Sequence, residues 1–479
     1  MTKAMQDVID VRHLIAGEWI ASPATDVTTD PYRGTAVARV ARGDAGVVDR
    51  AVAAARAAAP GVAAMPAHER AAILHRAAAL IVERAGEIGE TMARETGKAL
   101  GDATGEVRRS QDTMTLSAEE AVRIEGSHVP LDASAMGSGK IAFMLRFPVG
   151  VVGAVTPFNA PFNLACHKIG PAFAAGNACV LKPPPQAAAV VDRLARIFED
   201  AGAPPGALNV VHGGADVGRA LVADPRVDFV TFTGSSGAGA AIKAATGLRH
   251  VALELGGAGQ TIVHADGDLE RAAPMVARNA MRLAGQSCIS VQTVYVHRSV
   301  LARFTEMVVA EVERLVTGDP LAEGTDIGTL IDEAAARRVE SWIAEARAGG
   351  ARILTGGTRQ GAAVTPTVIA DPQPTDRVVC DEVFGPVVSL VGYDDIEAVF
   401  RSVSESRYGL QCGIFTASNA VMLRAYRAIR TGGLIVNGTS TWRTDQLAYG
   451  GVKDSGIGRE GPRYAIRDMT EERMILFNM

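Results

Sequence analysis

The sequence predicts an α/β protein with two domains, each built on a mainly parallel sheet. The chain has 479 residues, more than one hydrophobic core usually accommodates. Apolar, strand-like runs alternate with helical runs between residues 149 and 257, and the alternation resumes beyond Gly257. Because parallel strands need long crossover connections, this alternation is typical of parallel sheets.

The N-terminal part, from Gly17 to about Gly126, has apolar positions at helical spacing in runs such as VDRAVAAARAAAP and HERAAILHRAAALIVERAG. We expect this part to be mostly amphipathic helix. The helical period is lost between about Ser127 and Pro148. There HVPLDASAMGSGKIAFMLRFP predicts an exposed hairpin with a Gly-Ser-Gly turn.

Two series of strands follow. The first consists of VGVVGAVTP, ACVLKP, LNVVHG, DFVTFTG and HVALELGG, with helices in AAAVVDRLARIFEDAG and ADVGRALVADP. The second consists of TVYVHRS, ARILTGG, VVSLVGY, QCGIFTA and GLIVNGT. Two α/β domains joined near the Gly256-Gly257 pair are therefore expected.

Composition argues against two partner classes. The net charge of -5 offers no basic excess for nucleic acid or acidic membranes. The first residues, MTKAMQDVIDVRHL, lack the apolar core of a signal peptide, and prolines and asparagines interrupt the most apolar stretch, residues 147–165. A cytoplasmic protein is expected.

The five cysteines are scattered and odd in number, with no CxxC spacing, which suits neither a disulfide frame nor a zinc site. Cys166 lies beside His167 in a helical run, where adjacent side chains diverge, so the pair is accidental. Cys179, Cys380 and Cys412 are expected in the core. Cys288 instead lies on a connection beginning at Gly285, which suits a nucleophile.

Ligands of parallel sheets gather at the carboxyl ends of strands, and three such ends carry candidates. Gly234 to Gly239 offers backbone amides and the hydroxyls of Ser235 and Ser236 to a pyrophosphate, although a simple turn is the alternative. Lys182 precedes three prolines and suits phosphate or ribose, or is merely solvated. Glu254 is either a paired structural carboxylate or a base with a raised pKa.

Four motifs in order resemble the aldehyde dehydrogenase superfamily: TPFN ending at Asn159, ELGG holding Glu254, GQ-x-C at Cys288, and EVFGP from Glu382 to Pro386. The resemblance runs from about Gly17 to the C-terminus, and the separation of 288 − 254 = 34 residues between Glu254 and Cys288 fits the family. It implies an aldehyde dehydrogenase-like fold with two Rossmann-type α/β domains and a small β oligomerisation flap.

The resemblance also implies a mechanism. A Cys288 thiolate would attack the aldehyde, with the Asn159 amide and the Cys288 backbone amide facing the resulting oxyanion. Hydride transfer to a nicotinamide would leave a thioester, hydrolysed by water that Glu254 activates, giving a free acid. A coenzyme A-acylating dehydrogenase and a non-catalytic protein of the same fold are the alternatives.

For the cofactor, NADP is favoured and NAD stays open. Pro185 stands where NAD-preferring members often carry a glutamate that would repel a 2′-phosphate. The resemblance implies that Lys182 contacts the adenosine ribose, and it also includes Lys182 among the catalytic residues. No metal is expected. The resemblance assigns the cofactor site to Thr156, Pro157, Phe158, Lys182, Pro185, Gly214, Gly234, Ser235, Ser236, Gly239, Leu255, Glu382 and Phe384.

The C-terminal run AYGGVKDSGIGREGPRYAIRDMTEERMILF resembles the branch of lactaldehyde, phosphonoacetaldehyde and non-phosphorylating glyceraldehyde-3-phosphate dehydrogenases. It implies a small oxygenated or semialdehyde-type substrate. Ser287 stands where some members place an anion-binding arginine, which weakens the phosphorylated options. Arg109, Arg443 and Arg459 are candidate anion partners.

The family architecture supplies the domain limits. A cofactor domain would comprise residues 1–127 and 149–256, a catalytic domain residues 257–445, and the flap residues 128–148 and 463–479. Unpaired edges on such a flap would need a second subunit to cover them, so a homodimer or homotetramer is expected.

Overall fold

The computed structural model describes residues 8–479, and the start of the chain, where no signal peptide is expected, lies partly outside them. Its largest sheet has eight strands, parallel in the centre and antiparallel at the edges. The five strands of the first predicted series are confirmed as its centre. In sheet order the strands are β22 (Gly456–Ile457), β12 (His250–Glu254), β11 (Phe229–Thr233), β8 (Val151–Val155), β9 (Ala178–Lys182), β10 (Leu208–Val210), β2 (His13–Ile15) and β3 (Glu18–Ile20).

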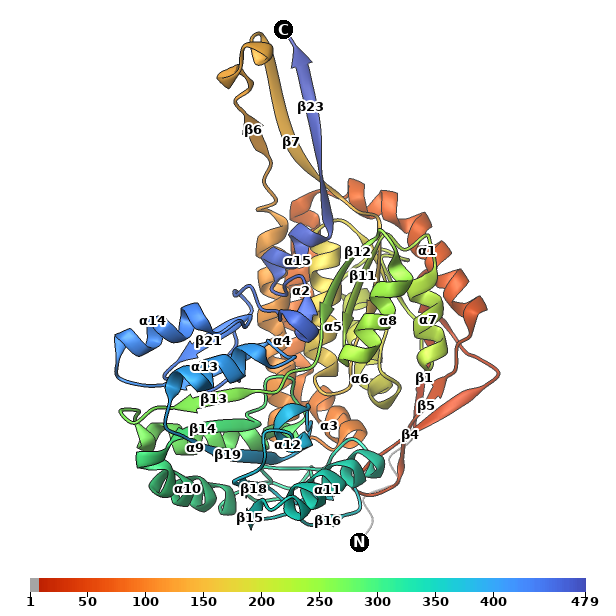
Figure 1. Ribbon diagram of the computed structural model, residues 1–479. Coiled ribbons are helices and arrows are strands. Elements are labelled where there is room, and N and C mark those ends of the chain that lie inside the picture. Colours follow the sequence, from red (N-terminus) through yellow and green to blue (C-terminus); the bar gives the residue numbers. More distant parts are fainter. Residues whose placement is uncertain (1–7) are drawn as a thin grey trace.

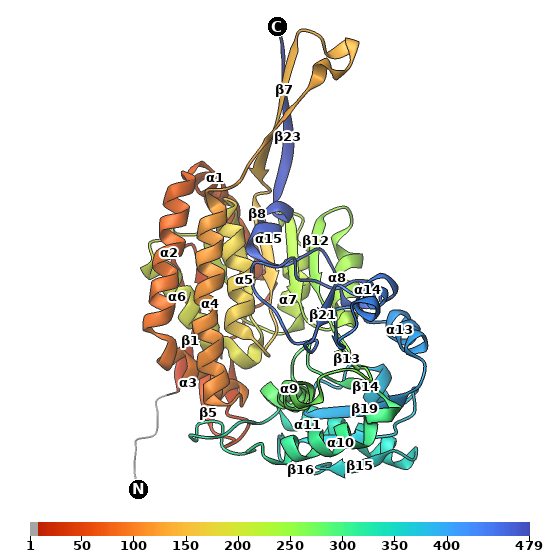
Figure 2. The same cartoon turned by 90° about the vertical axis from the view of Figure 1, so that its left-hand side faces the viewer.

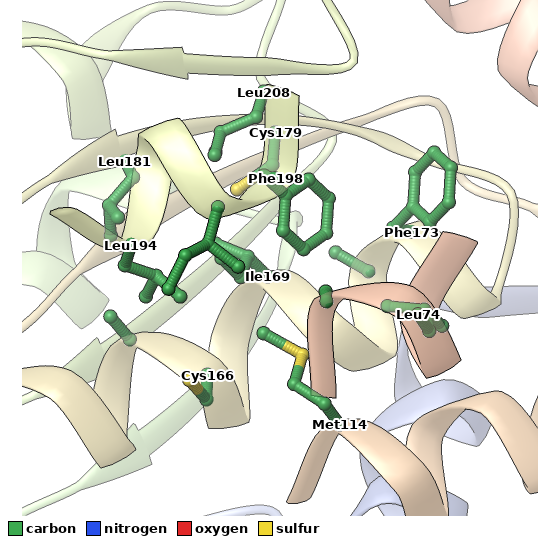
Figure 3. Packing of buried hydrophobic residues seen from close by; sticks show 14 of the residues in the cluster. Leu74, Met114, Cys166, Ile169, Phe173, Cys179, Leu181, Leu194, Phe198 and Leu208 are labelled. Carbon is green, nitrogen blue, oxygen red and sulfur yellow. The ribbon is translucent and has the colours of Figure 1, made fainter. Parts of the chain in front are cut away.

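Helices cover both faces of this sheet (Figure 2). One face carries α1 (Ala45–Ala64), α7 (Ala215–Ala223) and α8 (Ser236–Thr246). The other carries α2 (Ala67–Glu83), α4 (Leu100–Ala121), α5 (Pro161–Ala174) and α6 (Ala188–Asp200), with α3 (Ala85–Thr96) and α15 (Pro462–Asp468) beside them. The core under these helices includes Phe173, Phe198, Cys166 and Cys179 (Figure 3). Within residues 8–479, no helix has both the length and the apolarity to cross a bilayer.

The expectation of mostly helix between Gly17 and about Gly126 is confirmed by the four helices from Ala45 to Ala121, but it is wrong for the first part of that segment. Besides β3, it contains β4 (Thr25–Thr29) and β5 (Ala36–Ala41), which pair with each other, and β5 also pairs with β1 (Ile9–Val11). Threonine and valine at alternating positions favour a strand here. Helix begins only at Ala45, where the Asp44 side chain accepts from the Val47 amide at 2.9 Å.

A second sheet of seven strands confirms the second predicted series and adds two strands that the sequence analysis missed, β13 and β18. Neighbouring strands are parallel except β15 and β18. Helices α9 (Leu269–Met281), α10 (Arg298–Glu313), α11 (Glu333–Ala348), α13 (Ile396–Glu405) and α14 (Asn419–Ala428) surround it. The strand order is β15 (Arg352–Thr355), β18 (Thr367–Ala370), β19 (Val387–Tyr393), β14 (Thr293–His297), β13 (Gln260–Val263), β20 (Gln411–Phe415) and β21 (Gly433–Val436).

A three-stranded antiparallel sheet projects from the body (Figure 1). It consists of β6 (Ser127–Val129), β7 (Lys140–Pro148) and β23 (Thr470–Asn478). The connection from β6 to β7 runs over residues 130–139 and contains two short 3₁₀ turns, and the expected Gly-Ser-Gly turn at residues 137–139 leads from the second of them into β7. β23 pairs with β7 along its whole length, from Thr470 opposite Pro148 to Asn478 opposite Lys140.

Candidate functional site

The site lies where loops of the two large sheets meet. Glu254 ends β12, and Asn159 lies in the loop between β8 and α5. From the second sheet come the loop before β14, which carries Cys288, and the loop before β19, which carries Glu382. The carboxyl edge of the first sheet is thus combined with the amino edge of the second.

Two glycines let these loops approach closely. A Cβ on Gly256 would lie 2.6 Å from Glu382 Oε2, and a Cβ on Gly257 would lie 2.2 Å from the Cys288 carbonyl oxygen. The Gly257 amide also donates to Glu382 Oε1 at 3.0 Å. The ELGG sequence therefore brings Glu254, Cys288 and Glu382 into one site, because no larger residue would fit between them.

Buried glutamines on either side of Cys288 fix its loop. The side-chain Nε2 of Gln286 donates to the carbonyl oxygens of Leu283 and Thr329, at 3.2 and 3.4 Å. Gln292 holds the neighbouring loop, since its Oε1 accepts from the Val383 amide at 2.8 Å and its Nε2 donates to the Asp381 carbonyl. The Gly-Gln pair before the cysteine is thus part of a turn whose conformation is fixed by side-chain hydrogen bonds.

Cys288 is half-buried, and its Sγ lies 3.4 Å from the Tyr449 hydroxyl. Burial raises the pKa of the Cys288 thiol to about 12. The hydrogen bond from Tyr449 acts in the opposite direction, whereas the charges of Glu382 and Glu254 act with burial.

Two buried carboxylates near the cysteine have opposite character. Burial, and secondarily Glu460, raise the pKa of Glu254 well above its usual range, and Glu254 Oε2 has no partner among the described residues. Burial also acts on Glu460, but ion pairs with Lys168 and with Arg443, the latter at 3.0 Å, hold its pKa well below the usual range. The surroundings therefore favour the protonated form of Glu254 and the ionised form of Glu460.

The predicted cofactor residues line the carboxyl ends of β8, β9 and β11. The Thr156 amide donates to the Lys182 carbonyl at 3.3 Å, and burial lowers the pKa of the Lys182 ammonium to about 8. Pro157 follows in the same loop. The rings of Phe158 and Phe384 meet edge to face, with centroids 6.0 Å apart. These contacts bring both sides of the predicted nicotinamide site together.

The remaining predicted residues lie around the N-termini of three helices, α8, α7 and α6. Ser235 caps α8, accepting from the Ala238 amide at 3.4 Å, and the Ser236 hydroxyl donates to the Asp454 carbonyl at 2.7 Å. A Cβ on Gly239 would lie 2.4 Å from Leu255, so these two predicted residues are in contact. The Gly234 amide donates to the Glu254 carbonyl at 3.0 Å, Gly214 precedes α7, and Pro185 begins a 3₁₀ turn before α6.

The model of the aldehyde dehydrogenase family matches residues 19–475, nearly the whole chain. The chain belongs to the aldehyde dehydrogenase family. The family and fold that the four motifs predicted are therefore confirmed, and the protein is an oxidoreductase that acts on aldehydes.

Similar proteins of this family cover the chain almost completely. A 3-sulfolactaldehyde dehydrogenase from Priestia aryabhattai is 43% identical over 97% of both chains. The structure of aldehyde dehydrogenase 21 from Physcomitrella patens, in complex with the reaction product succinate, has 37% identity, a TM-score of 0.96 and 99% coverage of both chains. The NADP complex of an NADP-dependent glyceraldehyde-3-phosphate dehydrogenase from Bacillus halodurans has 34% identity, a TM-score of 0.96 and coverage of 98% and 99%.

The other four cysteines are placed as expected, with one exception. Cys166, Cys179 and Cys412 are buried, and His167 contacts Arg443 and Asp445. Cys380 is exposed, so its assignment to the core is wrong. It ends the short surface helix α12 (Arg377–Cys380), whose valines are buried while its last residue faces outward.

The three candidate arginines of this aldehyde dehydrogenase have different surroundings. The charge of Arg443 acts on the pKa of Cys288, and its guanidinium carbon lies 3.9 Å from the centre of the Tyr449 ring. Arg109 reaches the same cluster through Asp445 at 2.7 Å. Arg459 donates to two backbone carbonyls, those of Gly451 and Gly458.

Three residues of the site escaped the sequence analysis: Tyr449, Glu460 and Lys168. Lys168 could have been found from the sequence, because a lysine in the helical run PFNLACHKIG must be paired when that helix is buried. Tyr449 precedes two glycines in AYGGVK, a pattern too common to single out. Only the fold places it against the cysteine.

Proposed function

We propose that the protein oxidises a small anionic aldehyde to the free carboxylic acid, with Cys288 as the nucleophile and Glu254 as the general base. The close approach at Gly256 and Gly257 carries this proposal, because it sets an unpartnered, protonatable carboxyl group beside the cysteine loop. Cys288 attacks the aldehyde carbon, and the carbonyl oxygen becomes an oxyanion.

Asn159 and the Cys288 backbone amide donate hydrogen bonds to that oxyanion. Support for this role of Asn159 comes from its loop, which is tied to the site through the contact of the preceding Phe158 with Phe384. A nicotinamide cofactor, when bound, accepts the hydride from the substrate carbon. Glu254, in its ionised form, then takes a proton from water, and the resulting hydroxide attacks the thioester.

The described residues fit a nicotinamide dinucleotide. The hydroxyls of Thr156 and Thr233 are buried without a partner among residues 8–479, at the ends of β8 and β11 where such a cofactor would lie. We assign Lys182 to the adenosine ribose, the Gly234–Gly239 turn with Ser235 and Ser236 to the pyrophosphate, and Glu382 to the nicotinamide ribose. The other predicted residues, Pro157, Gly214 and Leu255 among them, complete the walls.

We favour NADP over NAD because Pro185 leaves no carboxylate three positions after Lys182 to repel a 2′-phosphate. The similar glyceraldehyde-3-phosphate dehydrogenase is NADP-dependent. Asp216 keeps NAD as an alternative, since its carboxylate is near enough to act on the pKa of Lys182, in the direction opposite to burial.

The preference for an anionic substrate rests on Arg443. Its side chain is buried, and its Nε has no hydrogen-bond partner among the described residues. A donor in this position suits a carboxylate or sulfonate on the aldehyde. The names of two similar proteins agree, since one acts on 3-sulfolactaldehyde and the other was solved with succinate. Position 287, directly before the cysteine, is a serine and not a second arginine that could bind a phosphate.

A panel of aldehydes tests this proposal. We expect carboxylated and sulfonated aldehydes to give higher kcat/KM than neutral aldehydes of the same length, with NADP above NAD. In Arg443→Gln, kcat/KM for the anionic aldehydes should fall about 10- to 100-fold more than for the neutral ones. Arg298→Gln, a surface ion-pair residue, is the control. An unchanged anionic-to-neutral ratio would contradict the assignment of Arg443.

We also propose a cytoplasmic homodimer or homotetramer. The projecting sheet exposes apolar side chains and a free strand edge, which a second copy would cover. The two large sheets support the division into a cofactor domain and a catalytic domain, and β6, β7 and β23 support a flap, although α15, most of which lies in the predicted flap segment 463–479, packs with α4 and α5 on the first sheet.

A further inference from the structure

Tyr449 lies between the cysteine and an arginine. Its hydroxyl is 3.4 Å from Cys288 Sγ, and the guanidinium of Arg443 stacks on its ring at 3.9 Å. Backbone hydrogen bonds with Glu460, at 3.1 and 2.6 Å, fix the residue from the other side. The tyrosine is buried, so the position of its hydroxyl relative to the sulfur is well defined.

The direction of this hydrogen bond follows from protonation. Burial, together with the neighbouring Cys288, raises the pKa of Tyr449 well above its usual range, so the phenol keeps its proton. A thiolate has no proton to donate. Once Cys288 is ionised, the tyrosine hydroxyl is therefore the donor and the sulfur the acceptor.

The sulfur needs such a donor. Burial and the charges of Glu382 and Glu254 all oppose a negative charge on Cys288. Among the described residues, the Tyr449 hydroxyl and the Arg443 cation favour that charge. A cation on the face of an aromatic ring draws electron density from the ring, which makes the phenol a stronger donor.

We propose that Tyr449 is a further catalytic residue, which donates a hydrogen bond to the Cys288 thiolate, while Arg443 on its ring strengthens that donor. When the thiolate forms, the S–H electron pair stays on sulfur and the proton leaves to solvent, while Tyr449 retains its own. The inference rests on the proposed role of Cys288 as the nucleophile.

Alkylation of Cys288 by iodoacetamide tests the inference on the full-length protein. Modification is followed at the Cys288 peptide by mass spectrometry as a function of pH. In Tyr449→Phe the thiolate fraction at pH 8 should fall about ten-fold, as expected for loss of a hydrogen bond to a charged group. The alkylation rate should fall about three-fold, because the more basic thiolate is also the better nucleophile.

Tyr295→Phe is the matched control. It removes a buried tyrosine hydroxyl whose partner, the Ser402 hydroxyl, lies 3.4 Å away in a different cluster. This variant should alkylate like the wild type. A rate in Tyr449→Phe that is unchanged, or faster than in the wild type, would overturn the inference and leave Tyr449 a packing residue.

Two further measurements keep the test decisive. If Tyr449→Phe no longer melts cooperatively, the alkylation test is repeated with 3-fluorotyrosine at position 449. This residue keeps the shape of tyrosine, and its phenol is a stronger hydrogen-bond donor. Faster alkylation at pH 8 is then expected, and a slower or unchanged rate would overturn the inference. If Cys288→Ala retained turnover, the proposed function would fail independently of Tyr449.

Discussion

At the scale of single residues, the site separates two buried carboxyl groups by their neighbours. Lys168 and Arg443 pair with Glu460, which stays ionised and acts as a fixed negative charge. Within residues 8–479 no cation lies at hydrogen-bond distance from Glu254, so burial and the charge of Glu460 favour its protonated form. Divergent pKa values of this kind distinguish a titrating base from a structural carboxylate.

The same comparison favours one of the two interpretations that the sequence left open for Glu254. A paired structural carboxylate would show a cation or amide donors at both oxygens. Its Oε2 instead lacks a partner among the described residues, and the Cβ that Gly450 lacks would lie 2.8 Å from its Oε1. The geometry favours the base with a raised pKa, which is the form that the proposed mechanism needs.

At the scale of elements, one helix supplies the N-terminal cap of another. Glu95 of α3 accepts from the Ala189 and Val190 amides at the start of α6, at 3.1 and 2.9 Å. The residue before α6 is Ala187, whose side chain cannot cap. Despite these donors, burial raises the pKa of Glu95 to about 7, so α3 and α6 are joined by a titrating group.

This cap predicts a pH-dependent stability. Between about pH 4.5 and 7 the folded protein binds a proton at Glu95 that the unfolded chain releases, so this group's contribution to stability is lost as the pH rises through 7. Glu95→Gln does not titrate. The melting temperature of Glu95→Gln minus that of the wild type should therefore increase from pH 5 to pH 8.

Exposed Glu87, on the same helix, provides the control variant Glu87→Gln, for which the difference should stay constant. A difference for Glu95→Gln that shrinks as the pH rises would contradict the assignment.

Most elements of the fold could be predicted because their signals are local. Alternating strands and helices, and short motifs at strand ends, depend on a few neighbouring residues, which is why the positions of Cys288 and Glu254 on their elements were found from sequence. Early strands β4 and β5 were missed because alanine-rich helices dominate the segment that follows. Tyr449 was missed because its contact with Cys288 spans 161 residues and depends on how two sheets are joined.

At the scale of the whole molecule, one face of the projecting sheet carries a strip of exposed apolar side chains. Directly opposite residues of β7 and β23 share this face, and the Phe143–Ile475 and Ile141–Phe477 pairs lie on it. All four side chains are exposed, between 37% and 46%. An apolar strip on a narrow sheet that projects from the body needs a covering surface.

Lysines on this face should therefore separate the subunits. We expect the double variant Phe143→Lys, Ile475→Lys to have the mass of one chain by light scattering, whereas the wild type has that of two or four. Leu248→Lys, at a fully exposed leucine in the turn between α8 and β12, is the control and should leave the mass unchanged. A wild type with the mass of one chain would contradict the proposed assembly.

Rapid mixing of Glu254→Gln with aldehyde and NADP tests whether Cys288 forms a thioester that water, activated by Glu254, hydrolyses. We expect a burst of one reduced cofactor per active site, followed by turnover reduced about 10²- to 10⁴-fold, because the acyl-enzyme forms but is not released. Cys288→Ala should give no burst. Normal steady turnover in Glu254→Gln, or reduced cofactor formed by Cys288→Ala, would show that the thioester mechanism is wrong.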